Sequence, residues 1–215
     1  LQAVVGAAQL LATRRDAGVR PAEVETIDAA SKSLLTLIDG VMSYSRLEAG
    51  VVTPVLSSFE LRDCIDEAER VVLSAYSRPD VRLVIDVAEG VPPRIHTDSG
   101  MLRQILINLF GNSMKFATAG EVRLTVTADA PARGDEPYLL RFTVADTGPG
   151  IDHVTQQRLF QPFQQGATGS GQSGAVGSGL GLVICSLLVK ARGGTIEMKS
   201  EPGKGTHMMF TVLAH

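Results

Sequence analysis

The sequence has 215 residues, with 20 lysine and arginine against 23 aspartate and glutamate, which gives a formal net charge of −3. This balanced, slightly acidic charge argues against a protein that binds nucleic acid through bulk positive potential. With 44% apolar and 20% charged residues the chain can bury a core, and no apolar run approaches the about 18 residues that span a membrane.

Residues 1–50 carry a helical period of apolar residues that is interrupted once, between Asp16 and Pro21. Pro21 suits the first turn of a second, longer helix that ends at Gly50. We therefore predict a helical hairpin over 1–50. Two helices cannot enclose a core alone, so the simplest closure is a dimeric four-helix bundle built from two copies of the chain. The alternative is that the hairpin folds back on the rest of the same chain.

A linker at 51–57 leads into an α+β pattern, and we place one domain at 58–215. Helices are expected at 61–72, 99–116 and 180–192, and strands at 81–87, 121–128, 138–145, 195–199 and 207–213. The apolar face of the first helix would consist of Leu61, Cys64, Ile65, Ala68, Val71 and Val72. The expected architecture is a layer of helices over one face of a mostly antiparallel sheet.

The two cysteines, Cys64 and Cys185, fall within apolar helical patterns and have no spacing typical of a metal site. We expect both to be reduced thiols in the core, which suits the cytosol. Because the sequence begins at Leu1 without a methionine, we also expect it to be part of a longer protein.

The helix expected at 99–116 carries Asn108, Asn112 and Lys115 at positions i, i+4 and i+7, which share one face. Amide oxygens suit a hard cation such as Mg²⁺ that is shared with phosphates, and the lysine adds a positive charge for a phosphate. An ordinary solvated polar stripe is the alternative interpretation.

Asp146 follows an expected strand and begins the sequence Asp-Thr-Gly-Pro-Gly, which ends at Gly150. Gly148 and Gly150 permit a tight turn and the close approach of a ligand. A carboxylate at this point can accept a hydrogen bond from a ligand amine. A plain Asp-Thr-Gly turn is the alternative.

Seven of the 22 glycines fall between positions 166 and 181. Phe160 and Phe163 precede this cluster. They either anchor a mobile loop or belong to the core. The cluster ends in Gly177-Ser-Gly-Leu-Gly181 and is followed at once by an apolar helix. Glycines that open a helix let phosphate oxygens reach free backbone N–H groups at the positive end of the helix dipole. A linker or a tight helix start would have the same composition.

These motifs resemble, in order, the N, G1, F, G2 and G3 boxes of two-component sensor histidine kinases. The matching segments are 108–115, 146–150, 160–163, 177–181 and 203–205. The preceding hairpin, which ends with Tyr44 to Gly50, looks like the dimerisation and histidine-phosphotransfer domain of the same family. The resemblance implies a dimeric helical hairpin followed by a Bergerat-type α/β sandwich that binds ATP.

The resemblance also implies roles for single residues. Asn112, assisted by Asn108, would bind Mg²⁺, Asp146 would bind the adenine amine, and 164–179 would form a lid over ATP. The complete set of ATP-binding residues that it implies is Asn108, Asn112, Lys115, Phe116, Asp146, Gly148, Gly150, Gly177, Gly179, Leu180, Gly181 and Thr206.

At two positions the residue differs from the one usual in related proteins. ATPases of the same fold carry a glutamate that activates water at the position of Asn108, and an asparagine cannot act as a general base. Ser113 stands where the histidine kinases usually have alanine, and we expect this difference to have no effect.

The phosphoacceptor histidine of the family lies on the first helix of the hairpin, and the start of this sequence resembles the stretch just after it. We therefore expect the acceptor upstream of Leu1, so that this chain alone holds no catalytic residue and cannot phosphorylate itself. We expect the four histidines present to be structural or exposed. They are His96, His153, His207 and His215.

The function implied is autophosphorylation from Mg-ATP followed by phosphotransfer to an aspartate of a response-regulator receiver domain. The partners implied are a second copy through 1–50, the receiver domain and an upstream sensor region, without nucleic acid or membrane contact by this chain. The implied location is cytoplasmic, either free or as the cytosolic part of a membrane-bound receptor. The alternatives are a degenerate module that binds nucleotide and dimerises without phosphotransfer, and an ATPase of the same fold.

Overall fold

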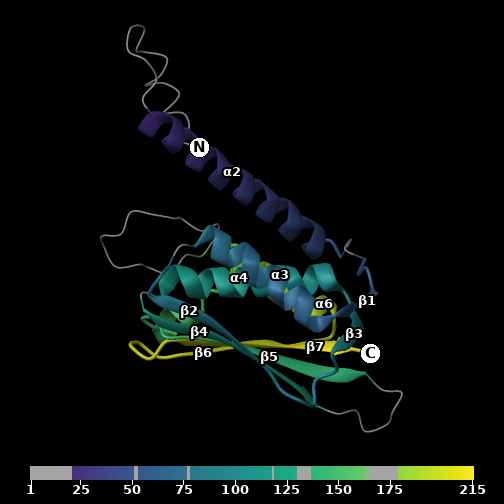
Figure 1. Cartoon of the computed structure of the whole chain (residues 1–215). Helices are drawn as coiled ribbons and strands as arrows, with labels where there is room; N and C mark the ends of the chain where they lie inside the picture. The colour runs from purple at the N-terminus through teal and green to yellow at the C-terminus, as the bar shows by residue number, and fades with distance from the viewer. Residues whose placement is uncertain are drawn as a thin grey trace, which may run out of the picture.

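A computed structural model shows how the chain is arranged (Figure 1). It describes residues 21–50, 53–76, 78–117, 119–129, 137–162, 164 and 179–215, without the side chains of 21–29, 32, 33 and 36. The first arm of the predicted hairpin therefore lies outside the described residues.

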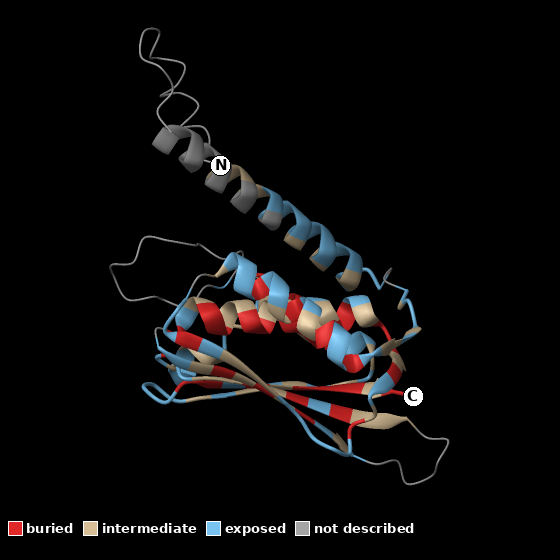
Figure 2. Ribbon diagram, in the orientation of Figure 1, coloured by how far each residue is buried: buried red, intermediate tan, exposed pale blue. Residues whose placement is uncertain are grey.

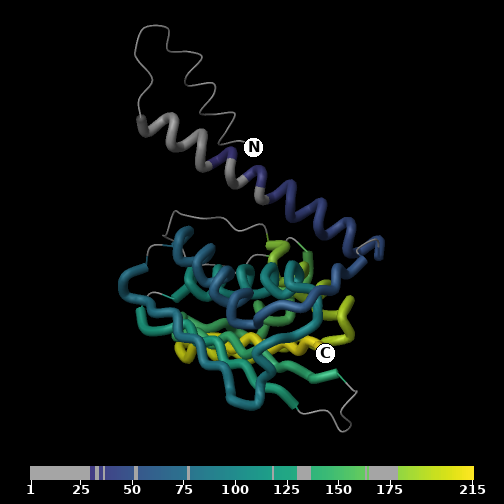
Figure 3. The backbone as a smooth tube through the Cα atoms, turned by 45° about the vertical axis from the view of Figure 1, so that its right-hand side comes forward, coloured from purple at the N-terminus to yellow at the C-terminus, as the bar shows by residue number. Residues whose placement is uncertain are grey.

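The second arm is a single helix, α2, which runs from Pro21 to Glu48. As predicted, it begins at the proline. Its C-terminal end contacts helix α6 (Gly181–Ala191), and there Tyr44 and Leu47 pack against the core of the rest of the chain. From that contact α2 extends away from the body of the molecule (Figure 3). Five apolar side chains in its middle are exposed: Leu35, Leu37, Ile38, Val41 and Met42.

The body is built on a five-stranded sheet in the order β2-β4-β5-β7-β6. Its strands are β2 (Val81–Val87), β4 (Gly120–Asp129), β5 (Tyr138–Asp146), β6 (Ile196–Ser200) and β7 (Thr206–Ala214). Only β2 and β4 are parallel among these pairs. The pairs β4–β5 and β6–β7 join strands that follow each other in the chain, and the predicted, mostly antiparallel character of the sheet is confirmed.

Three helices cover one face of this sheet, and their buried sides face it (Figure 2). They are α3 (Leu61–Ala75), α4 (Ser99–Phe116) and α6. Beneath them Phe142 and Phe210 lie directly opposite each other on β5 and β7, with ring centroids 4.7 Å apart. Both rings are fully buried, and such cross-strand aromatic pairs stabilise a sheet. The predicted layer architecture is confirmed.

The prediction for the apolar face of α3 was wrong at one position. Val71 is 46% exposed, whereas Ala68 and Val72 on the same helix are buried. Val71 lies beside the stripe that faces α4, so the stripe is one residue narrower than the apolar pattern suggested.

Three short elements were not predicted. Strands β1 (Ser57–Glu60) and β3 (Arg94–Thr97) form a separate antiparallel pair, and α5 (His153–Gln156) is a single helical turn. Each has four residues, too few for a periodic pattern. Strand β1 begins on the last residue of the predicted linker, and the domain boundaries stay a prediction.

Helix α4 begins at a carboxylate that also holds a distant segment. Asp98 is the N-cap, and its Oδ1 accepts a hydrogen bond from the backbone N–H of Met101 at 2.9 Å. Its Oδ2 accepts another from the N–H of Val55 at 2.8 Å. The connection from α2 is therefore fixed to the start of α4.

Both cysteines are free thiols in the core, as predicted. Burial raises the pKa of Cys64 to about 11 and that of Cys185 to about 12. Among the residues that the structure describes, no helix has the length and apolar character needed to cross a membrane.

Candidate functional site

The polar stripe of α4 lies beside the start of α6. Asn108, Asn112 and Lys115 are all half-buried, and they sit next to a fully packed stripe of the same helix. The Asn108 amide donates a hydrogen bond from Nδ2 to the carbonyl oxygen of Gly181 at 3.4 Å. Helix α4 thereby brings its first asparagine against Gly181, which is the first residue of α6 and the last glycine of the cluster.

Lys115 and Phe116 close the C-terminal end of this stripe. The Lys115 ammonium lies 5.1 Å from the centre of the Phe116 ring, within the range of a cation–π contact. Partial burial lowers the pKa of Lys115, because desolvation disfavours its charge. An anion beside this ammonium would offset that cost. The Phe116 ring is 40% exposed, so one part of it remains open to a ligand.

Asp146, at the end of β5, has both carboxylate oxygens engaged. Its Oδ1 accepts hydrogen bonds from the backbone N–H of Gly148 at 2.9 Å and of Thr206 at 3.2 Å. Its Oδ2 accepts one from the Ser113 hydroxyl of α4 at 3.1 Å. Donors from the turn after β5, from β7 and from α4 therefore hold this carboxylate in one orientation.

Two glycine turns interlock behind Asp146. The N–H of Gly203 donates to the carbonyl oxygen of Pro149 at 2.7 Å, which joins the turn after β5 to the turn between β6 and β7. Gly150 and Gly205 have φ of +69° and +83°, and a Cβ on either would overlap a backbone carbonyl, of Glu201 and of Asp146 respectively. Only glycine fits at these close approaches.

Helix α6 begins without a side-chain cap, because its N-cap residue is Leu180. Gly179, just before it, has φ of +69°. Backbone N–H groups in the first turn of a helix have no partner within the helix. This end of α6 can therefore accept an anion, next to Asn108.

Part of the predicted site lies outside the described residues. This applies to Gly177, to Phe163 and to residues 165–178 of the predicted lid. Phe160 is described, and it packs half-buried against the core. Of the two interpretations for this ring, core packing agrees with the structure.

A divalent cation at this site would depend on asparagine. Across the described ranges, no group of three or more histidine, cysteine, aspartate or glutamate side chains could hold a metal ion. The oxygen donors on α4 are the amides of Asn108 and Asn112, which suit Mg²⁺ only together with water or phosphate oxygens. The donor set thus fits a cation that arrives with a phosphate ligand.

One residue of this arrangement was given no role by the sequence. Ser113 is 5% exposed, and its hydroxyl contacts the carboxylate of Asp146. Buried hydroxyl groups almost always have a hydrogen-bond partner. The sequence signal that could have indicated this contact is the position of Ser113 directly after Asn112, on the side of the helix that faces the core.

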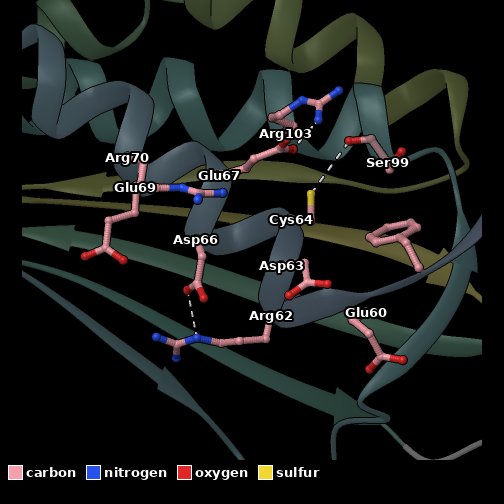
Figure 4. Close-up of a pocket in the computed structure, with 11 residues that line it drawn as sticks. Glu60, Arg62, Asp63, Cys64, Asp66, Glu67, Glu69, Arg70, Ser99 and Arg103 are labelled. Carbon is pink, nitrogen blue, oxygen red and sulfur yellow. Dashed lines mark hydrogen bonds and ion pairs between the residues drawn. The ribbon is translucent and has the colours of Figure 1, made fainter.

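A separate groove of about 730 Å³ runs along α3 and the start of α4 (Figure 4). Two of its arginines pair with acidic side chains of the groove, Arg62 with Asp66 at 2.8 Å and Arg103 with Glu67. The Cys64 thiol donates to the carbonyl oxygen of Ser99 at 3.7 Å. None of the predicted ATP-binding residues lines this groove, so we assign it no part in nucleotide binding.

Comparison with known proteins agrees with the resemblance seen in the motifs. Residues 97–215 match the family described as histidine kinase-, DNA gyrase B- and HSP90-like ATPases. The chain is 36% identical to the hybrid signal transduction protein dokA of Dictyostelium discoideum, over 97% of this chain and 13% of that protein. It is 33% identical to the sensory/regulatory protein RpfC of Xanthomonas campestris, over 98% of this chain and 29% of that protein. It therefore spans less than a third of the length of either relative.

Solved structures have the same fold. Full-length ShkA, crystallised in complex with AMPPNP, aligns with a TM-score of 0.74 and 30% identity, over 99% of this chain and 42% of that chain. The histidine kinase AdeS of Acinetobacter baumannii also aligns with a TM-score of 0.74, at 17% identity, over 98% of this chain and 92% of that chain. The chain belongs to the histidine kinase-, DNA gyrase B- and HSP90-like ATPase family, and its resemblance to two-component sensor histidine kinases is confirmed.

Proposed function

We propose that this chain is the catalytic core of a sensor histidine kinase that binds Mg-ATP. The observation that carries the proposal is the fixed carboxylate of Asp146, whose Oδ1 is held by the N–H groups of Gly148 and Thr206. With Oδ1 occupied by backbone donors, Oδ2 is the oxygen that can accept a hydrogen bond from the adenine amine. Gly148, Gly150 and Thr206 shape the adenine pocket around this carboxylate, and Phe116 lines it.

The phosphates occupy the opposite end of the site. Lys115 contacts a phosphate, and the amide oxygens of Asn112 and Asn108 would hold Mg²⁺, which when bound neutralises phosphate charge. The start of α6, with Gly179, Leu180 and Gly181, supplies backbone N–H groups to the phosphates. Residues 164–179, including Gly177, form the lid that excludes water.

Asn108 favours phosphoryl transfer to a protein side chain over hydrolysis. A carboxamide cannot take a proton from water at neutral pH, so this chain has no general base at the position where the ATPases of the fold have one. Its own residues then act by positioning and charge neutralisation. The γ-phosphoryl group passes to Nε2 of a histidine upstream of Leu1, and afterwards to an aspartate of a receiver domain.

The exposed apolar stripe of α2 supports a dimer through residues 1–50. Leu37, Ile38 and Val41 are between 38% and 49% exposed, and one helix cannot bury them by itself. Two copies of the chain would pair along this stripe, while Tyr44 and Leu47 keep their packing against the body.

Calorimetric titration with ADP and MgCl₂ tests nucleotide binding. Asp146→Ala and Asn112→Ala should each weaken ADP binding at least about tenfold, since each removes a hydrogen bond or a ligand to a charged group. Gln104→Ala, an exposed change on the same helix, is the control and should have no effect. Unchanged affinity in Asp146→Ala would refute the proposed site.

Phosphotransfer is tested in a version of the protein that carries the sequence upstream of Leu1. Incubation with γ-labelled ATP should produce label on the protein that is lost in acid and kept in base, as expected of phosphohistidine. Nucleotide binding without any label would favour the regulatory module instead. Rapid phosphate release that depends on Asn112 would favour the ATPase.

A further inference from the structure

Ser113 occupies an unusual place for a helical serine. It lies near the C-terminal end of α4, directly after Asn112, and is 5% exposed. Serine is a poor residue for a helix interior, because its hydroxyl competes for backbone hydrogen bonds. Here the hydroxyl donates to Asp146 Oδ2 at 3.1 Å, across to the end of β5. An alanine at this position would remove this hydrogen bond, so the contact of the hydroxyl with Asp146 is the feature to explain.

The full set of hydrogen bonds to Asp146 explains this contact. An ionised carboxylate has about four acceptor sites, two on each oxygen. Both sites of Oδ1 are used by the N–H groups of Gly148 and Thr206. On Oδ2, the Ser113 hydroxyl takes one site and leaves one for a ligand. The hydroxyl therefore determines the direction in which the last acceptor site of Asp146 points.

We propose that Ser113 is a positioning residue that aims Oδ2 of Asp146 at the exocyclic amine of a 6-aminopurine nucleotide and so sets selectivity for that base. The inference rests on the proposed function, in which Asp146 binds the adenine amine. Each of the three hydrogen bonds that the described residues make to this carboxylate comes from a donor, and the remaining site of an ionised carboxylate can only accept. A base with an amine at this point gains a hydrogen bond, and a base without one leaves the half-buried acceptor unpaired.

A purely structural role for Ser113 makes a different prediction. If the hydroxyl only joined α4 to β5, its removal would affect all nucleotides equally, whatever group the base carries. If it aims Oδ2, its removal should affect only ligands that present the amine. The two roles are separated by the ratio of two affinities, which does not depend on the overall stability of the protein.

The experiment measures the affinity of ADP and of purine riboside 5′-diphosphate, which lacks the amine, by calorimetry with MgCl₂. Ser113→Ala should weaken ADP binding about tenfold and should change the affinity of the analogue by less than about twofold. Ser74→Ala removes an exposed hydroxyl from α3 and serves as the control, with no change for either ligand. Ser113→Thr keeps the hydroxyl and should retain most of the selectivity. Urea unfolding of each variant shows that it is folded.

Equal losses for the two ligands in Ser113→Ala, or no loss of ADP affinity, would overturn the inference. Asp146→Ala separates this result from failure of the proposed function. Loss of ADP binding in Asp146→Ala together with equal losses in Ser113→Ala defeats only the role of Ser113. Unchanged ADP binding in Asp146→Ala defeats both proposals, because Ser113 acts through that carboxylate.

Discussion

The turn between β6 and β7 contains two glycines with the same backbone conformation and different surroundings, which provides a matched pair of substitutions. Gly203 and Gly205 have φ of +79° and +83°. A Cβ on Gly203 would meet no atom within 4 Å, whereas a Cβ on Gly205 would overlap the carbonyl oxygen of Asp146. Gly203→Ala therefore measures backbone strain alone, and Gly205→Ala measures strain together with the overlap.

The magnitudes follow from these two contributions. A non-glycine residue in the left-handed region costs about 1 kcal/mol, which is the loss of unfolding free energy expected for Gly203→Ala. An added methyl group that forces the backbone to move costs about 2 kcal/mol more. Gly205→Ala should therefore lose about 3 kcal/mol in total. Because the overlap is with Asp146, and Thr206 is the next residue, the displacement also reaches the candidate site.

Urea unfolding monitored by circular dichroism measures the free energies, and calorimetry with ADP measures the effect on the site. We expect Gly205→Ala to weaken ADP binding at least about tenfold, since it shifts a donor and the carboxylate that accepts from it. Gly203→Ala should leave the affinity within about twofold. Equal stabilities and equal affinities in the two variants would refute the close approach of Gly205 to Asp146.

Other predictions concern the cap of α4, the thiols and the lid. Asp98→Ala should lower the free energy of unfolding by about 2 kcal/mol in urea, because it removes the acceptors for the α4 cap and for Val55; a change below about 0.5 kcal/mol would contradict this role. Cys64 and Cys185, with pKa values raised to about 11 and about 12, should resist iodoacetamide at pH 8 in the folded protein. Iodoacetamide reacts with the thiolate, which forms only as the pH rises toward the pKa, so both cysteines should react within minutes once urea restores an ordinary pKa of about 8.5. Mass spectrometry measures the labelling, and rapid labelling of the folded protein would argue against burial. Limited proteolysis should cut within 164–179 in the free protein and more slowly with Mg-ADP; equal rates would argue against a closing lid.

The sequence predicted the fold best where the pattern was long. Helix α4 has the bounds that were predicted, residues 99–116, because the cap residue, the apolar period and the polar stripe all agree over 18 residues. Strands β4 and β5 were also predicted to within two residues at each end. Local propensity and burial favour the same structure in these segments.

The β1–β3 pair could not be predicted for a physical reason. Ser57 pairs with Thr97, and all of α3 and β2 lie between them in the chain. Each strand has only four residues, and β3 follows two prolines. Such a pair is stabilised by contacts between distant segments, which leave no periodic signal in either one.

In the candidate site, too, the residues with a local sequence motif could be predicted, and the contacts between distant segments could not. The order of the motifs predicted Asn108, Asn112 and Asp146 as site residues, since each stands in a recognisable local sequence. Two of the three hydrogen bonds to the Asp146 carboxylate come from residues 33 and 60 positions away, and only the one from Gly148 is local. A sequence gives residue types and local spacing, but the donors of a carboxylate are selected by tertiary packing.

Gly203 and Gly205 show why residue type and turn pattern together are still insufficient. Both glycines belong to the turn between β6 and β7, and their positive φ values are typical of glycine in turns. Only the packing distinguishes them, since one faces open space and the other touches the backbone of Asp146. The turn that closes the β6–β7 hairpin therefore also sets the position of the carboxylate at the end of β5. Gly205 and Ser113 both approach Asp146, the glycine at its main-chain carbonyl and the serine at its carboxylate. Their substitutions should consequently be non-additive in ADP affinity, whereas Gly203→Ala and Ser113→Ala should add.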